Sequence, residues 1–151
     1  PSPEFKPELC VIDGLRIDWS DGSSTTGAGI VSGVSVPRAN RLVGEFVGVV
    51  AGHSVAGFIN TGHRLETDAP AHIHNVVFDN SHDEVTTDGV ELGTIIGTHS
   101  HGSYLPMNPA IADAIIARTT GQSLLGQSAH SERADHAAQK SRAAIKQRLG
   151  L

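Results

Sequence analysis

The segment Ile96–Asp113, IGTHSHGSYLPMNPAIAD, is the most informative part of this chain. Its apolar start and the glycine at position 102 predict a strand that ends in a turn. Asn108 and Pro109 then favour the start of a helix, because Asn is a good N-cap and Pro has no N–H for the first turn to leave unpaired. His101 therefore lies at the end of a strand, where rigid backbone holds it near the surface, and such a position suits a general base.

The sequence around this segment predicts strands before it and helices after it. Four runs rich in β-branched residues, separated by turn residues, are expected to form strands: residues 41–50, 55–60, 73–78 and 90–97. One helix is expected after Pro109 and a second over about Ser131–Leu149, joined by a linker rich in Gly, Ser and Gln. Residues 1–29 contain three prolines and are expected to be irregular. A mixed sheet followed by helices belongs to the α/β or α+β class.

Composition excludes several classes of function. The 151 residues suffice for one domain, and a net charge of −5 argues against a nucleic-acid binder that works by phosphate neutralisation. We expect no membrane insertion, because no apolar run approaches the length of a membrane-spanning helix. Cys10 is the single cysteine, so an intrachain disulfide and a zinc site built mainly on thiolates are excluded. A cytoplasmic setting is the simplest expectation.

The chain is rich in histidine, with nine among its residues. Two pairs have His-x-His spacing: His72 with His74, and His99 with His101. On a strand, such residues point to the same face, which is a recurring arrangement for two metal ligands. His82 and Asp83 could complete such a site. The alternative is that these histidines are ordinary surface or hydrogen-bonded side chains, and the spacing does not decide between the two.

The segment that contains His101 resembles a known family. Its ordered pattern is Gly97-Thr98-x-x-His101-Gly102-x-x-Leu105-Pro106-x-Asn108-Pro109-x-x-Ala112-Asp113. This pattern is similar to the catalytic-histidine segment of cobyric-acid-synthase-type glutamine amidotransferases, and most of all to that of the glutaminase subunits of lipid II isoglutaminyl synthases. Shorter similarities occur in the family's order at residues 27–31, 41–44 and 57–62, so the resemblance covers roughly residues 8–118.

The resemblance implies a fold and a domain organisation. The fold would be an α/β class I glutamine amidotransferase-like, flavodoxin-like sheet that lacks the N-terminal β-α-β half of the family, with helices at its C-terminal end. Residues 1–118 would form the amidotransferase-like domain, and residues 119–151 a linker and a basic helix. Because an open sheet edge invites pairing, a homo-oligomer or a partner subunit is expected to cover it.

The resemblance also implies an activity. In this family, a cysteine thiolate attacks the side-chain amide of L-glutamine, a histidine moves the protons, and ammonia passes to a second active site. For the isoglutaminyl synthases, the second site belongs to an ATP-dependent, Mur-ligase-like partner that amidates the D-glutamate of lipid II in peptidoglycan synthesis. His101 would then be the catalytic base and Arg41 would bind the substrate. No cofactor and no metal are implied.

The nucleophile departs most from the family pattern, Cys-Gly-Gly-Tyr-Gln-Leu-Leu-Gly. Residues 7–14 here read PELCVIDG, and alignment of the last glycines places Pro7 at the cysteine position. A shift of three residues makes Cys10 the nucleophile but replaces both elbow glycines by Val11 and Ile12, and β-branched residues fit such a turn badly. Two alternatives therefore stay open: a catalytically impaired relative that acts as a binding or scaffold module, and a histidine-based metal-binding protein.

Overall fold

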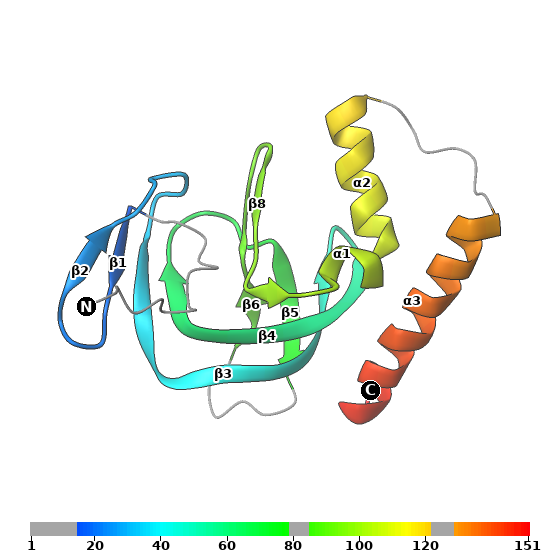
Figure 1. Cartoon of the computed structure of the whole chain (residues 1–151), viewed down its shortest axis with the longest axis horizontal. Coiled ribbons are helices and arrows are strands. Elements are labelled where there is room, and N and C mark those ends of the chain that lie inside the picture. The colour runs from blue at the N-terminus through cyan, green and yellow to red at the C-terminus, as the bar shows by residue number, and fades with distance from the viewer. Residues whose placement is uncertain (1–14, 79–84, 122–128) are drawn as a thin grey trace, which may run out of the picture.

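A curled sheet with helices at one end forms the molecule. The computed structural model describes residues 15–78, 85–121 and 129–151. Within these ranges, a seven-stranded mixed sheet and a separate two-stranded hairpin precede three helices. Strands β1 and β2 lie at one end of the sheet, and α1, α2 and α3 gather at the other (Figure 1). The predicted α/β class, with a mixed sheet and C-terminal helices, is confirmed.

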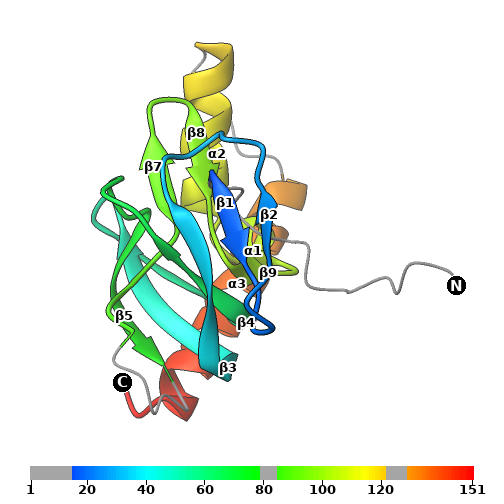
Figure 2. The same ribbon diagram turned by 90° about the vertical axis from the view of Figure 1, so that its left-hand side faces the viewer.

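Short strands surround two long ones. The strands are β1 (Arg16–Asp18), β2 (Ser24–Thr26), β3 (Val34–Val50), β4 (His53–Glu66), β5 (Ile73–Phe78), β6 (Thr87–Asp88), β7 (Val90–Leu92), β8 (Ile95–Gly97) and β9 (Ser100–His101). The helices are α1 (Tyr104–Met107), α2 (Pro109–Thr120) and α3 (Ala129–Arg148). Figure 2 shows the β7–β8 hairpin beside α2.

The β3–β4 hairpin is the centre of the sheet. Val50 is paired with His53 across a two-residue turn, and both turn residues have positive φ: 47° at Ala51 and 84° at Gly52. Two consecutive positive φ values define the type I′ turn, whose twist matches that of the strands it joins. The two strands stay paired from this turn to the Val34–Glu66 pair, with one register shift between Pro37 and Leu42.

Because β3 is long, two different strands share one of its edges. Its first residues pair in parallel with β1, and its last residues pair antiparallel with β5. On the other edge of the hairpin, β9 pairs with β4. The β1–β3 pairing is the single parallel one among the described strands, and the helices follow the strands instead of connecting them. A flavodoxin-like fold has parallel strands connected by helices. The described strands do not confirm such an arrangement, which stays a prediction.

The main hydrophobic core is formed by side chains from the inner face of the β3–β4 hairpin, from strand β5 and from helices α1 and α2. Its members are Leu42, Phe46, Val50, Val55, Ile59, Ile73, Val76, Tyr104 and Ile111. Phe46, Ile59 and Ile73 are fully buried. Gly57 permits this packing, because a Cβ there would lie 2.6 Å from the ring of Phe46 and from Oγ of Ser100. Because glycine has no side chain, β3 and β9 can both approach β4 at this position.

Helix α3 covers part of the outer face of the hairpin. Ile145 packs with Val47 of β3 and Ala56 of β4, and Ala138 is also buried. At its C-terminal end, Arg148 forms an ion pair of 2.6 Å with Glu45 of β3. The predicted helix is thus confirmed with nearly the expected bounds, and the division of the chain at residue 118 stays a prediction. No helix in the described ranges is both long and apolar enough to cross a bilayer.

Two expectations about the strands were wrong in detail. Residues 90–97 form a hairpin, β7–β8, instead of one strand, because Gly93 adopts a φ of 58° and turns the chain. Residues 16–26, expected to be irregular, form the β1–β2 hairpin. Strands of three residues are too short to show a two-residue period in the sequence.

Candidate functional site

His101 lies where the resemblance to the amidotransferases predicts a catalytic base, at the end of a short strand. It is paired with Phe58 of β4 and followed by Gly102, whose φ of 65° turns the chain into α1. The side chain is half-buried, and its Nε2 lies 3.0 Å from the main-chain oxygen of Asn60. A carbonyl oxygen only accepts hydrogen bonds, so Nε2 donates. A neutral His101 therefore keeps Nδ1 as its basic nitrogen, the atom that takes up a proton.

Asn60 connects His101 to Arg41. The Nε atom of Arg41 donates a hydrogen bond of 2.6 Å to the side-chain oxygen of Asn60. Arg41 lies in the register shift between Pro37 and Leu42, and it is exposed. An exposed guanidinium presents a planar set of donors that matches a carboxylate. The residues Arg41, Asn60 and His101, which we call the Arg41–Asn60–His101 cluster, thus bring an imidazole and an exposed guanidinium to the two sides of one asparagine.

Asn60 lies in a recognised motif, but no role was predicted for it. The residue lies in Gly57–Gly62, a stretch that resembles the family pattern Gly-Phe-Glu-Asn-His-Gly. Its asparagine matches, but the motif alone does not show that it bridges two other site residues. Only the pairing of β9 with β4 places Asn60 beside His101.

The candidate nucleophile lies outside the described residues. Cys10 and the alternative position Pro7 both fall within residues 1–14, so the structure does not place either of them relative to His101. His82 and Asp83, considered as further metal ligands, also lie outside the described ranges.

A buried carboxylate holds the segment that leads to His101. Asp88 Oδ1 lies 2.8 Å from Nδ1 of His99, and its Oδ2 accepts hydrogen bonds from the main-chain N–H of His99 and from the hydroxyl of Thr98. Burial raises the pKa of the Asp88 carboxyl, but the hydrogen bonds from His99 and Thr98 outweigh this effect and bring the pKa below its usual value. Asp88 is therefore ionised, and Nδ1 of His99 carries the proton that it donates.

A second carboxylate–histidine contact lies beside α2. Nδ1 of His72 donates to Glu91 over 3.0 Å, and the hydroxyl of Tyr104 donates to Nε2 of His72 over 3.2 Å. Arg118 donates to the other oxygen of Glu91 over 2.8 Å. Hydrogen bonds from His72 and Arg118 lower the pKa of Glu91, whereas burial and the nearby carboxylates raise the pKa of the Tyr104 hydroxyl, which stays protonated.

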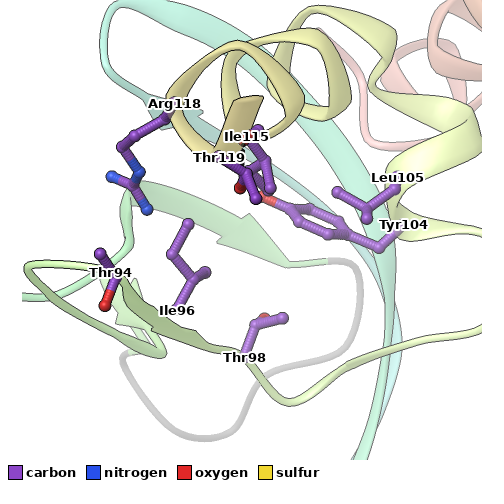
Figure 3. A pocket seen from close by; sticks show the side chains of 8 residues that line it. All are labelled: Thr94, Ile96, Thr98, Tyr104, Leu105, Ile115, Arg118 and Thr119. Carbon is purple, nitrogen blue, oxygen red and sulfur yellow. Dashed lines mark hydrogen bonds between the residues drawn. The ribbon is translucent and has the colours of Figure 1, made fainter. Parts of the chain in front are cut away.

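A pocket of about 660 Å³ lies between the β7–β8 hairpin and α2. Figure 3 shows the ring of Tyr104 at one side of this pocket and the side chain of Arg118 extending from α2 toward Thr94 and Ile96. Its lining is mainly apolar. His101 and Arg41 do not line it, so this pocket is separate from the Arg41–Asn60–His101 cluster.

Within the described residues, neither His-x-His pair presents its two side chains to one place. His72 is buried against Glu91 while His74 is exposed, and His99 contacts Asp88 while His101 contacts Asn60. The expectation that each pair shares a face was wrong, because His72 precedes β5 and His99 precedes β9, so the two-residue period of a strand does not extend across either pair. The described residues contain no group of three or more His, Cys, Asp or Glu side chains that could hold a metal ion.

Comparison with known proteins gives one informative similarity. No family model matches the chain. The chain is 30% identical over 107 residues to lipid II isoglutaminyl synthase (glutamine-hydrolyzing) subunit GatD of Staphylococcus aureus (strain N315), a match that covers 70% of this chain. The same match covers 44% of the relative, so the chain spans less than half the length of that protein. The similarity supports a GatD-like relationship, as the histidine segment predicted.

Proposed function

We propose that the chain is a glutamine amidotransferase-like subunit with glutaminase chemistry. The observation that carries this proposal is the Arg41–Asn60–His101 cluster: residues matched separately to three family motifs are joined by hydrogen bonds in one place. The similarity to GatD over 107 residues supports the same reaction class. The relative's name describes an isoglutaminyl synthase that hydrolyses glutamine, and we extend that chemistry to this chain.

The proposed reaction is an acyl transfer in two stages. The thiolate of Cys10 attacks the side-chain amide carbon of L-glutamine, the C–N bond breaks, and ammonia leaves as a thioester forms. His101 first takes the proton of the Cys10 thiol at Nδ1 and delivers it to the departing nitrogen. It then takes a proton from the water that hydrolyses the thioester to glutamate and returns it to the Cys10 sulfur. Arg41 binds the α-carboxylate of glutamine through its planar donors, and Asn60 holds Arg41 and His101 in their relative positions.

In this proposal, the ammonia is consumed by a second protein. An ATP-dependent, Mur-ligase-like subunit would activate the carboxylate of the D-glutamate in lipid II, and ammonia would then form its amide. The face beside His101 suits such a partner, because Val43 and Phe58 are exposed there: 42% of Val43 and 39% of Phe58 is accessible. Neighbouring apolar side chains that form a contiguous exposed patch mark interaction surfaces, whereas single ones do not.

The test is a glutaminase assay of the purified chain, with and without a Mur-ligase-like partner. We expect glutamate release from wild type, its loss in Cys10→Ala and His101→Ala, and a raised KM for glutamine in Arg41→Gln. His136→Ala is the matched control, because His136 is an exposed histidine on α3 far along the chain from the cluster. Activity that survives in His101→Ala would contradict the proposed role of this histidine.

The exposed apolar face also favours the alternative of a binding module without glutaminase activity. A folded chain that binds the ligase partner but releases no glutamate in any variant would establish that alternative. In that case, Phe58→Asp should abolish binding of the partner, since a charge at the centre of an apolar contact opposes desolvation.

A further inference from the structure

We propose that Asp88 is a positioning residue for His101: by holding the segment Gly97–Ser100, it sets where β9 presents the imidazole. The structural part of this inference stands on the contacts of Asp88 alone. Its catalytic consequence rests on the glutaminase function proposed above.

The first argument is the number and burial of the contacts. The side chain of Asp88 is 7% exposed, and its two oxygens accept three hydrogen bonds from two consecutive residues, Thr98 and His99. One of these comes from the main chain of His99, so the carboxylate fixes the backbone as well as the ring. A buried carboxylate that is this fully hydrogen-bonded holds its donors in one arrangement.

The second argument is that Asp88 is itself firmly held. It lies on β6 in register with Ile73 of β5, and Ile73 is fully buried in the core. The next residue, Gly89, has a φ of 73°, and a Cβ there would lie 2.2 Å from the main-chain oxygen of Gly97. The corner after β6 is therefore in direct backbone contact with the start of the segment that Asp88 binds.

The third argument is that Thr98 and His99, which join β8 to β9, depend mainly on Asp88 for their side-chain hydrogen bonds. The Thr98 hydroxyl also accepts a hydrogen bond of 3.0 Å from the main-chain N–H of Ser100. Strand β9 consists of Ser100 and His101, which pair with Ile59 and Phe58, and Gly102 turns the chain immediately afterwards. A strand of two residues has few ladder hydrogen bonds of its own. The contacts of Thr98 and His99 with Asp88 are thus the anchor on the N-terminal side of His101.

The ionised form of Asp88 matters for this network, because both carboxylate oxygens then accept hydrogen bonds. An asparagine has the same shape but one acceptor oxygen, and its NH₂ group would face a donor. Asp88→Asn therefore keeps the volume of the side chain and disrupts part of the network. Thr98→Val removes one donor to Asp88 and also the acceptor of the Ser100 main-chain N–H, whereas His99→Phe removes only the ring contact with Asp88. We therefore expect from His99→Phe a smaller effect of the same kind.

The experiment combines NMR of the histidine rings with kinetics, both on the full chain. We expect Asp88→Asn to change the protonated ring nitrogen of His99 and to shift the ring signals of His101, with weaker ring contacts to Asn60. Asp68→Asn is the control, because Asp68 is exposed and its substitution removes the same charge. If glutaminase activity is present, kcat should fall about 10- to 100-fold in Asp88→Asn at an unchanged KM for glutamine, since a displaced base slows chemistry without affecting Arg41.

The outcomes separate the two proposals. Unchanged His101 signals in Asp88→Asn, with altered His99 signals, would overturn the positioning role whether or not the chain is active. Shifted His101 signals in an inactive wild type would support the positioning role and count against the glutaminase function. If Asp88→Asn does not fold, His99→Phe decides, because it removes the ring contact with Asp88 and keeps the Thr98 hydroxyl that Ser100 uses. Shifted His101 signals then support the proposal, and signals like those of Asp68→Asn overturn it.

Discussion

The two His-x-His pairs of this chain are built alike and differ in burial. In each pair the first histidine is buried and donates through Nδ1 to a carboxylate: His72 to Glu91, and His99 to Asp88. Glu91 keeps 35% of its side chain exposed and is shared with Arg118, whereas Asp88 is 7% exposed and accepts from the main chain as well. The same motif therefore gives a partly exposed contact, His72–Glu91, beside the pocket. It also gives a buried contact, His99–Asp88, in the segment that precedes the candidate base His101.

This difference predicts that Asp88 contributes more to the free energy of unfolding than Glu91 does. Asp88→Ala leaves Nδ1 of His99, its main-chain N–H and the Thr98 hydroxyl without their acceptor in a buried place, so we expect a loss of about 3–5 kcal/mol in the free energy of unfolding. Urea unfolding followed by circular dichroism measures this. Glu91→Ala is the matched comparison, and equal losses in the two variants would show that burial does not distinguish them.

Acid should act on the Asp88 contact in a defined window. Its pKa is lower in the folded protein than the value of about 3.9 in an unfolded chain, so the carboxylate stabilises the fold above that value. This contribution is lost as the pH falls through the folded pKa. Wild type should therefore lose more stability than Asp88→Asn between about pH 5 and pH 2. Parallel acid dependence of the two proteins in urea melts would contradict this reading.

Local sequence signals predicted much of the fold. The run from Arg41 to Val50 was correctly expected to be a strand, and Pro109 does begin α2. Asn108 shows where local reasoning stops: it was expected to cap α2, but its side chain makes no cap hydrogen bond. Instead it bonds both main-chain groups of Ala56 on β4, a contact between residues 52 positions apart. A long-range partner of this kind leaves no local pattern.

Those residues of the candidate site that belong to sequence motifs could be predicted. His101 and Arg41 were identified through separate resemblances, and their roles stay predictions that the proposed assay tests. Asp88 was missed because neither spacing nor composition shows that a two-residue strand will be bonded by a carboxylate ten positions before Thr98. Burial and pairing partners are properties of the folded chain, and they separate an anchoring carboxylate from an exposed one.

The smallest effect is expected at the more exposed of the two contacts. Glu91→Gln keeps an acceptor for His72 or Arg118 and removes a charge that water and salt already screen, so we expect a loss below about 1 kcal/mol that shrinks further at high salt. Thermal unfolding at low and high ionic strength measures this, with Asp68→Asn as a control for net charge. A large, salt-independent loss would mean that His72 and Glu91 form an anchor like that of Asp88, and the contrast between the two histidine pairs would no longer hold.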